Sequence, residues 1–240
     1  MGIQLFSLEY NILFTFAIIL ILSKLFLTSF LSKRILDKTK ERGEFKVDFI
    51  FSMFLILLGL LISRIIYLYY DFFLTLFNPE LLYIYPNVMY WKVAGLIAGS
   101  TQAVAVFFID RILLKFKLKG IPAYILLIGR IVQFFYPINS AQDFQIASSI
   151  GSILMFILII LPVIFIYIGV KTPELRYHSF LFVFGIILYF ISSIIVSEFI
   201  LAPIEASFGS GVRIIIPLIS NLLKIVGLAT MTYSSNKFYI

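Results

Sequence analysis

The chain has 240 residues and a net charge of +7, and 62% of its residues are hydrophobic whereas only 13% are charged. A soluble domain is typically about half apolar and about a quarter charged, and a chain of this length could not bury so many apolar side chains in one water-soluble core. The chain has no cysteine, which excludes a disulfide scaffold, a thiolate metal site and a cysteine nucleophile. Lipid is therefore the expected solvent for most of the protein.

Seven apolar segments approach the length that a helix needs to cross a bilayer, about 20 residues. Runs such as FAIILIL and MFILIILPVIFIYIGV are apolar on every face, as lipid-embedded helices are, whereas the strands of a membrane β-barrel alternate. We therefore predict one all-α domain over residues 1–240, a polytopic bundle of seven transmembrane helices. Their approximate ranges are 10–31, 48–70, 88–112, 121–138, 146–170, 179–201 and 211–233.

The connecting segments are short. FFLTLF and LLYIYP, after the second predicted helix, cannot span a bilayer, and we predict that they form an interfacial flap. Residues 32–47 predict a charged hairpin or a short amphipathic piece. None of these segments is large enough to be a folded domain, so any activity must come from the bundle or from a separate chain.

Basic residues accumulate on one side of the predicted bundle. Lys and Arg in short loops favour the cytoplasm, and thirteen of the nineteen basic residues follow the first, third, fifth and seventh predicted helices. This bias places the N-terminus outside and the C-terminus inside, in a multi-pass protein of the cell membrane. Such residues meet anionic lipid headgroups, which attract each of them by about 1 kcal/mol. The expected partners are the lipid bilayer, these headgroups and a separate cytoplasmic signalling protein, not nucleic acid.

The sequence shows none of the residue patterns that intramembrane enzymes use. The one histidine, His178, has no metal-binding or serine-centred motif near it, and Asp48, Asp71 and Asp110 fall at predicted helix ends. Nucleophiles, bases or metal ligands would have to converge inside the helices. We therefore expect a non-enzymatic protein without a catalytic residue, a metal or a cofactor.

Six basic residues lie within or at the edges of the predicted helices. Ionisable groups at bilayer depth cost several kcal/mol unless they are paired, hydrated or able to reach the surface, so they indicate function by default. Lys24 is near enough to the inner surface to extend its ammonium group there. Lys92 and Arg213 are near the outer surface and are either interface anchors or site residues. The six are Lys24, Arg64, Lys92, Arg130, Arg213 and Lys224, and Glu198 is the acidic residue that clearly accompanies them.

Helical spacing places polar residues on shared faces of three predicted helices. Pro217 lacks a backbone N–H and leaves a carbonyl free, which is common beside cavities in membrane helices. Gly95 and Gly99 indicate a close contact between helices rather than ligand binding, because small residues let two helices approach each other. The polar stripes comprise Arg213, Pro217, Ser220 and Lys224 with Asn221 beside them in the seventh helix, Lys92, Gly95, Gly99 and Gln102 in the third, and Arg130, Gln133 and Pro137 in the fourth.

If these stripes face one interior, they form a cationic pocket that opens outward. Its excess of positive charge predicts either an anionic or carboxylate-bearing ligand, or a buried lysine that is neutral. The alternative is a hydrogen-bond network that only holds the bundle together. The candidate ligand-binding residues are Arg64, Lys92, Gln102, Arg130, Gln133, Glu198, Ser220, Asn221 and Lys224.

Three resemblances bear on function. Lys224, halfway along the seventh helix, is similar to the retinal-binding lysine of microbial rhodopsins, although the third helix supplies no acidic counterion. Asp110 and Arg111 in FFIDRILLK resemble the acid–arginine pair of G-protein-coupled receptors, without the asparagine–proline motif of the seventh helix. The third helix, which contains both YWKVAGLIAG and FFIDRILLK, resembles the third helix of uncharacterised archaeal seven-helix membrane proteins of sensor type. This resemblance implies a sensor without an attached kinase and assigns no residue a role.

The leading hypothesis is a sensor or receptor-type module that binds a small ligand from outside. The rival is a small solute transporter or channel, because the helix count also suits the three-plus-three arrangement of SWEET-type sugar transporters. A receptor pocket should be closed toward the cytoplasm, whereas a transporter should show pseudo-symmetry and polar residues in its inner half. Thr230 and Thr232 do continue inward along the seventh helix. A retinal-binding protein that uses Lys224 is the third alternative.

Overall fold

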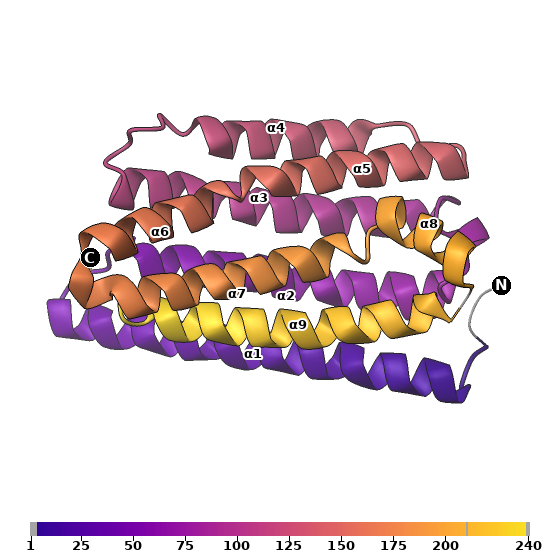
Figure 1. The fold of residues 1–240 in the computed structure, drawn as a ribbon, viewed down its shortest axis with the longest axis horizontal. Helices are drawn as coiled ribbons and strands as arrows, with labels where there is room; N and C mark the ends of the chain where they lie inside the picture. The colour runs from indigo at the N-terminus through magenta and orange to yellow at the C-terminus, as the bar shows by residue number, and fades with distance from the viewer. Residues whose placement is uncertain (1–3, 210, 239–240) are drawn as a thin grey trace.

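The apolar segments form helices throughout the part of the chain that the computed structural model describes, residues 4–209 and 211–238, and no strand occurs among these residues. The helices run along the long axis of one elongated bundle (Figure 1). The α-helices are α1 Leu8–Arg42, α2 Phe49–Tyr69, α3 Asn87–Leu113, α4 Ile121–Phe135, α5 Ala141–Ile157, α6 Ile160–Lys171, α7 Arg176–Ile194, α8 Glu198–Phe208 and α9 Val212–Ser235, and the short turns are η1 Tyr70–Thr75, η2 Pro79–Leu81 and η3 Pro173–Leu175.

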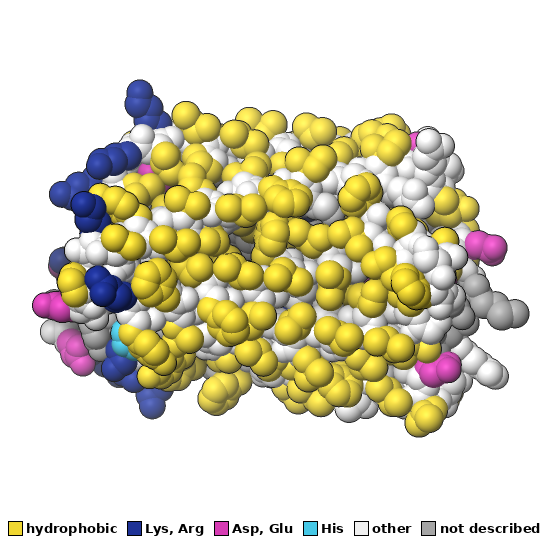
Figure 2. Space-filling view, viewed as in Figure 1, with side chains coloured by type: hydrophobic (Ala, Val, Ile, Leu, Met, Phe, Trp, Pro, Cys, Tyr) yellow, Lys and Arg dark blue, Asp and Glu magenta, His cyan; other side chains and the backbone are white. Residues whose placement is uncertain are grey.

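The prediction of a multi-pass helical membrane protein is confirmed. Within the described residues, six helical stretches are long and apolar enough to cross a membrane, and α4 is a shorter apolar helix beside them. At 1.5 Å per residue, α4 is about 22 Å long, less than the roughly 30 Å of a hydrocarbon core. Hydrophobic side chains cover the lateral surface, whereas Lys and Arg side chains gather at the end where α6 meets α7 (Figure 2).

Two of the predicted helices are interrupted. The segment predicted at 146–170 is divided into α5 and α6, which follow each other along one side of the bundle (Figure 1). Pro162 has no N–H for the carbonyl of Leu158, which instead accepts a hydrogen bond of 3.0 Å from the backbone N–H of Leu161, so the helix breaks one turn before the proline.

The prediction of one helix over residues 179–201 is wrong for its last turns. α7 ends at Ile194, and the separate helix α8 begins at Glu198. Ser193 donates to the carbonyl of Tyr189 at 2.8 Å, and Ser197 donates to the carbonyl of Ile194 at 2.7 Å. Such bonds from serine to the backbone compete with the helical ladder and bend helices.

The charged segment after the first predicted helix is not a hairpin. α1 continues as a helix to Arg42 and ends at Gly43, whose φ of 73° is the left-handed conformation that glycine adopts readily at a helix C-terminus. Arg42 then forms a 3.4 Å ion pair with Asp48, the residue that caps α2.

The predicted interfacial flap is instead built into the bundle. Phe72 of η1 is only 1% exposed and packs edge-on against Tyr10 of α1, with 5.5 Å between the ring centroids. Tyr70 donates a 2.9 Å hydrogen bond to the carbonyl of Leu82. The segment after α2 therefore covers one end of the bundle with buried side chains.

The helices form a closed ring. Neighbours in contact are α1 with α2, α2 with α3, α3 with α4, α4 with α5, α6 with α7, α7 with α9, and α9 with α1. At the basic end, four fully buried phenylalanines meet, with centroid distances of 4.2 Å between Phe165 and Phe182, 5.2 Å between Phe49 and Phe165, and 5.5 Å between Phe49 and Phe238. We name these four residues the phenylalanine cluster, and it fills the interior at the basic end.

Asp110 holds a loop rather than forming a receptor-like pair with Arg111. Its carboxylate accepts hydrogen bonds from the backbone N–H of Leu118 at 3.1 Å and of Gly120 at 2.8 Å, and the residue is 2% exposed. We expect Asp110→Ala to lower the free energy of unfolding by about 2 kcal/mol, because two backbone donors lose their acceptor. Thermal unfolding in detergent micelles measures this change. Arg111→Ala is the control, because Arg111 is exposed, and an equal effect of the two substitutions would contradict the assignment.

Candidate functional site

One cavity of about 310 Å³ lies inside the ring of helices. Residues from α1, α2, α3, α4, α5, α7, α8 and α9 line it, together with the segment after α2. The structure brings together on its wall all nine residues that the sequence nominated for ligand binding, so the polar stripes do converge. These nine are Arg64, Lys92, Gln102, Arg130, Gln133, Glu198, Ser220, Asn221 and Lys224.

The cavity occupies the half of the bundle away from the phenylalanine cluster. On α9 its wall extends from Arg213, near the start of the helix, to Lys224. At 1.5 Å per residue, Lys224 lies about 17 Å deeper than Arg213. Beyond Lys224 the interior is filled by apolar side chains such as Leu228 and Met231, and then by the phenylalanine cluster. The cavity is therefore closed toward the basic end.

All six basic residues of the membrane segments line this cavity, including Lys24, for which the sequence favoured the inner surface. Lys24 is 4% exposed and donates a 2.9 Å hydrogen bond to the carbonyl of Leu60, so it does not extend to the surface. Lys92 donates a 2.7 Å bond to the carbonyl of Tyr136. Lys224 makes no hydrogen bond or ion pair with any residue that the structure describes.

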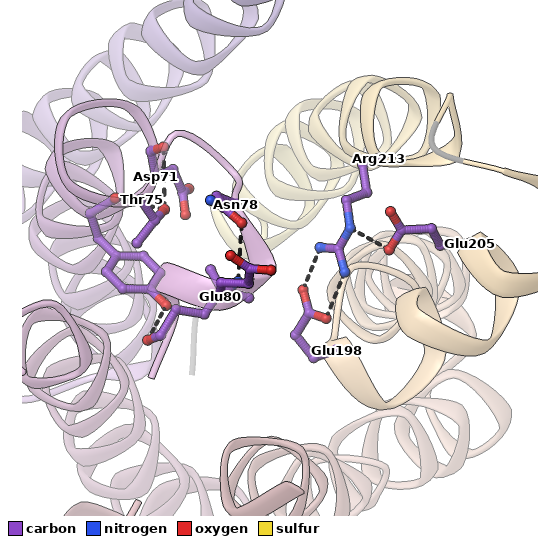
Figure 3. A network of polar contacts seen from close by, with 9 residues as sticks. Asp71, Thr75, Asn78, Glu80, Glu198, Glu205 and Arg213 are labelled. Carbon is purple, nitrogen blue, oxygen red and sulfur yellow. Dashed lines mark hydrogen bonds and ion pairs between the residues drawn. The ribbon is translucent and has the colours of Figure 1, made fainter. Parts of the chain in front are cut away.

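Arg213 is paired with two carboxylates. Its guanidinium donates to both oxygens of Glu198, at 2.8 and 3.1 Å, and its Nε donates to Glu205 at 2.5 Å. Figure 3 shows the two glutamates, both from α8, approaching Arg213 from different sides. This cluster ties α8 to the start of α9 beside the cavity.

Arg64 has a partner that sequence reasoning missed. Asp71, which the sequence places at a predicted helix end, forms a 3.2 Å ion pair with Arg64 and also lines the cavity. The two residues are seven positions apart, so a continued helix places them on one face two turns apart. Glu198 and Glu205, the two partners of Arg213, are also seven positions apart. This seven-residue spacing of charged residues was the signal in the sequence that their side chains share one helix face.

Gly99 lies at the contact between α3 and the neighbouring helix α4, where it makes room for the side chain of Arg130. A Cβ atom at Gly99 would lie only 2.2 Å from Cγ of Arg130. At Gly95, which does line the cavity, the nearest atom to such a Cβ is the Tyr67 hydroxyl at 3.6 Å, an ordinary contact. Gly59 of α2 makes room for Thr101 of α3, so it allows these two helices to pack closely.

Some of the other polar side chains form hydrogen bonds that join helices, and others have no partner among the described residues. Ser220 donates a 2.7 Å hydrogen bond to the carbonyl of Ser192 and so joins α9 to α7. The Gln102 Oε1 atom is buried and has no partner among the described residues. Trp91 lines the cavity and packs against Phe144, with 4.9 Å between the ring centroids. Further lining residues that sequence reasoning did not nominate are Lys24, Asp71, Ser148, Ser152 and Tyr189.

The cavity can hold an anion in mostly apolar surroundings. It offers guanidinium, ammonium and amide donors, which are the groups that bind carboxylates and phosphates. His178 does not line it and instead lies beside Tyr177 and Tyr233. Comparison of the chain with protein-family models, with curated proteins and with solved structures finds no match.

Proposed function

We propose that this protein is a non-enzymatic, receptor-type sensor of the cell membrane that binds a small anionic or amphipathic ligand in its cavity. In this proposal α4 is the seventh membrane-crossing helix, and the end that carries α8 faces outward. The observation that carries the proposal is a polar cavity in one half of the bundle, with the phenylalanine cluster between it and the basic end.

The charges of the cavity favour an anionic ligand. Six basic residues line it, whereas Asp71 and Glu198 are the acidic residues on its wall. Arg64 and Arg213 are neutralised by ion pairs, which leaves Lys24, Lys92, Arg130 and Lys224 without a carboxylate partner among the described residues. Uncompensated charges at bilayer depth are costly, so an anion that enters the cavity gains favourable electrostatic energy.

In this proposal, the basic end is the output surface. Lys and Arg side chains gather there (Figure 2), where anionic lipid headgroups and a separate cytoplasmic signalling protein would bind. A sensor of this kind resembles the archaeal seven-helix proteins that lack an attached kinase.

A small solute transporter or channel is the second candidate, and one observation favours it. Polar groups continue along α9 below the cavity, where the hydroxyls of Thr232 and Ser234 are buried without partners among the described residues. Buried polar groups in the inner half could line a pathway in a second conformation.

Cysteine accessibility tests both orientation and closure, because the chain has no cysteine of its own. We expect Ser193→Cys, on the cavity wall, to react with a membrane-impermeant maleimide added outside intact cells. Ser207→Cys, exposed at the end of α8, should react likewise, whereas Lys40→Cys, exposed at the basic end, should react only after permeabilisation.

The same variants separate the two candidate functions. If Ser193→Cys reacts equally from both sides in inverted and right-side-out vesicles, the cavity alternates between the two faces and the protein is a transporter. If Lys40→Cys reacts from outside and Ser207→Cys does not, the proposed orientation is wrong.

A further inference from the structure

Arg130 is a buried cation of the cavity that has no carboxylate partner among the described residues. It lies on α4 and is 7% exposed. Its Nη1 donates a 2.7 Å hydrogen bond to Oε1 of Gln133, and Nε2 of Gln133 donates a 2.8 Å bond to the carbonyl of Ala147 on α5. Two successive hydrogen bonds therefore fix the orientation of the guanidinium group.

The remaining edge of this guanidinium is unused. Its Nε is buried, and neither Nε nor Nη2 forms a hydrogen bond with any residue that the structure describes. The buried Oε1 of Gln102 also has no partner within residues 4–209 and 211–238. A buried donor without an acceptor is unfavourable, and more so when the group is charged. An acceptor from outside the chain would remove this cost at Arg130.

The surroundings of Arg130 form a slot with glycines on two sides. Gly99 of α3 faces the Arg130 stem, and a Cβ atom at Gly151 of α5 would lie 3.1 Å from Arg130 Nη1 and 2.6 Å from Gln133 Nε2. A larger residue at either glycine would displace the polar groups. Three helices thus hold this side chain in one place, whereas an arginine that serves as an interface anchor extends toward water.

The rest of the wall is suited to an apolar group. Ligand pockets are usually about 300–1,000 Å³, so a cavity of about 310 Å³ suits a small molecule. Aromatic and apolar side chains line the same cavity as Arg130, Gln133 and Gln102. They are Tyr67, Trp91, Phe134, Phe144, Met155 and Tyr189.

We propose, building on the function proposed above, that Arg130, Gln133 and Gln102 form a subsite for the carboxylate of a small amphipathic carboxylic acid. Nε and Nη2 of Arg130 bind the two carboxylate oxygens side by side, the geometry in which the planar guanidinium group matches a carboxylate. The Gln102 amide rotates to present its NH₂ group to the same carboxylate, since an amide offers donors on one side and an acceptor on the other. The aromatic wall receives the apolar part of the acid.

The charge of the subsite favours a carboxylate over a phosphate ester. One guanidinium neutralises one negative charge, whereas a phosphate monoester carries about −1.5 to −2 at pH 7. The other two arginines of the cavity are already bound to carboxylates of the chain, and Lys24 and Lys92 donate to the backbone carbonyls of Leu60 and Tyr136, so we count Arg130 as the one positive charge of this subsite.

Binding to the purified full-length protein in nanodiscs tests this proposal. The probes are 3-phenylpropanoate, the matching alcohol 3-phenylpropanol and 3-phenylpropyl phosphate, and the signal is the fluorescence of Trp91, the only tryptophan of the chain and part of the cavity wall. We expect the carboxylate to bind at least tenfold more tightly than the alcohol and than the phosphate. Arg130→Gln should reduce carboxylate affinity to that of the alcohol, and an unfolding temperature in detergent micelles close to that of the unmodified protein shows that the variant is folded.

A matched glycine pair provides a second measurement. Gly99→Ala should weaken carboxylate binding at least tenfold, because the new methyl group displaces Arg130, whereas Gly95→Ala should leave it within about twofold, because the nearest atom is at 3.6 Å. If both substitutions weaken carboxylate binding equally, Gly99 does not form a slot for Arg130.

The outcomes distinguish this subsite from the function on which it rests. Equal binding of carboxylate and alcohol, or tighter binding of the phosphate, overturns the carboxylate subsite but leaves a ligand-binding cavity. Failure of the carboxylate to bind also overturns the subsite. The receptor proposal itself is overturned by the labelling pattern of Ser193→Cys.

Discussion

Replacing Gly227 with alanine is expected to separate α7 from α9 and to lower the free energy of unfolding by about 3 kcal/mol. A Cβ atom at Gly227 would lie 2.8 Å from the backbone oxygen of Gly185 and 3.0 Å from the backbone nitrogen of Tyr189. Backbone atoms cannot rotate away as a side chain can, so the two helices must move apart. Inserting a methyl group into such a contact typically costs about 1–3 kcal/mol, and the Ser220–Ser192 hydrogen bond on the same face of α9 is lost as well.

Thermal unfolding in detergent micelles measures this effect, and Gly95→Ala is the matched control. Gly95 is also a helical glycine, but its nearest neighbour lies at an ordinary contact distance. Alanine is more favourable than glycine in a helix by about 1 kcal/mol, so the control should keep or raise stability. If Gly227→Ala unfolds at the same temperature as Gly95→Ala, the close contact between α7 and α9 does not exist in the protein.

Arg213→Ala is the second substitution with a large expected effect. It leaves Glu198 and Glu205 next to each other without their shared cation. Removing one partner from a buried ion pair costs about 3–5 kcal/mol. Because the Glu205 side chain is 26% exposed, we expect a loss of about 2–3 kcal/mol. We also expect α8 to detach, which faster proteolysis after Phe199 or Phe208 on that helix would report.

Neutralising the carboxylates separates a charge effect from a loss of contacts. In the triple variant Arg213→Met, Glu198→Gln and Glu205→Gln, no charge is left without a partner, so stability should recover by at least half of the loss. Lys46→Ala is the control, since the pair between Lys46 and Glu44 is exposed and surface pairs contribute little. An equal response to Lys46→Ala and Arg213→Ala would show that the cluster at Arg213 is only a surface contact.

Part of the candidate site could be found in the sequence because polar residues stand out in apolar helices. Arg64, Arg130 and Lys224 were recognisable without coordinates, since each charge at bilayer depth needs a reason. The spacing of polar residues on α3, α4 and α9 also indicated which faces point inward, and the structure places those faces around one cavity. Whether a ligand binds there remains a prediction.

The pairing within the site could not be predicted to the same extent. Lys24 meets the carbonyl of Leu60, which is 36 positions away in the sequence. A long flexible ammonium can reach either the bilayer surface or a neighbouring helix, and only the position of α2 decides between them. Gly99 was equally ambiguous, because a missing side chain allows either a close helix or a long side chain to fill the space.

The sequence by itself determined that this is a helical, multi-pass membrane protein with its basic residues concentrated on one side. Hydropathy over about 20 residues and the charge of adjacent loops are local properties, so they can be read from the chain directly. Only the tertiary structure decided the ring order, the breaks before Ile160 and Glu198, the inward packing of η1 and the ion pairs of the cavity. The physical reason is that lipid surrounds helices that are apolar on every face, so hydrophobic periodicity does not mark their contacts, and detailed packing and a few polar bonds select them instead.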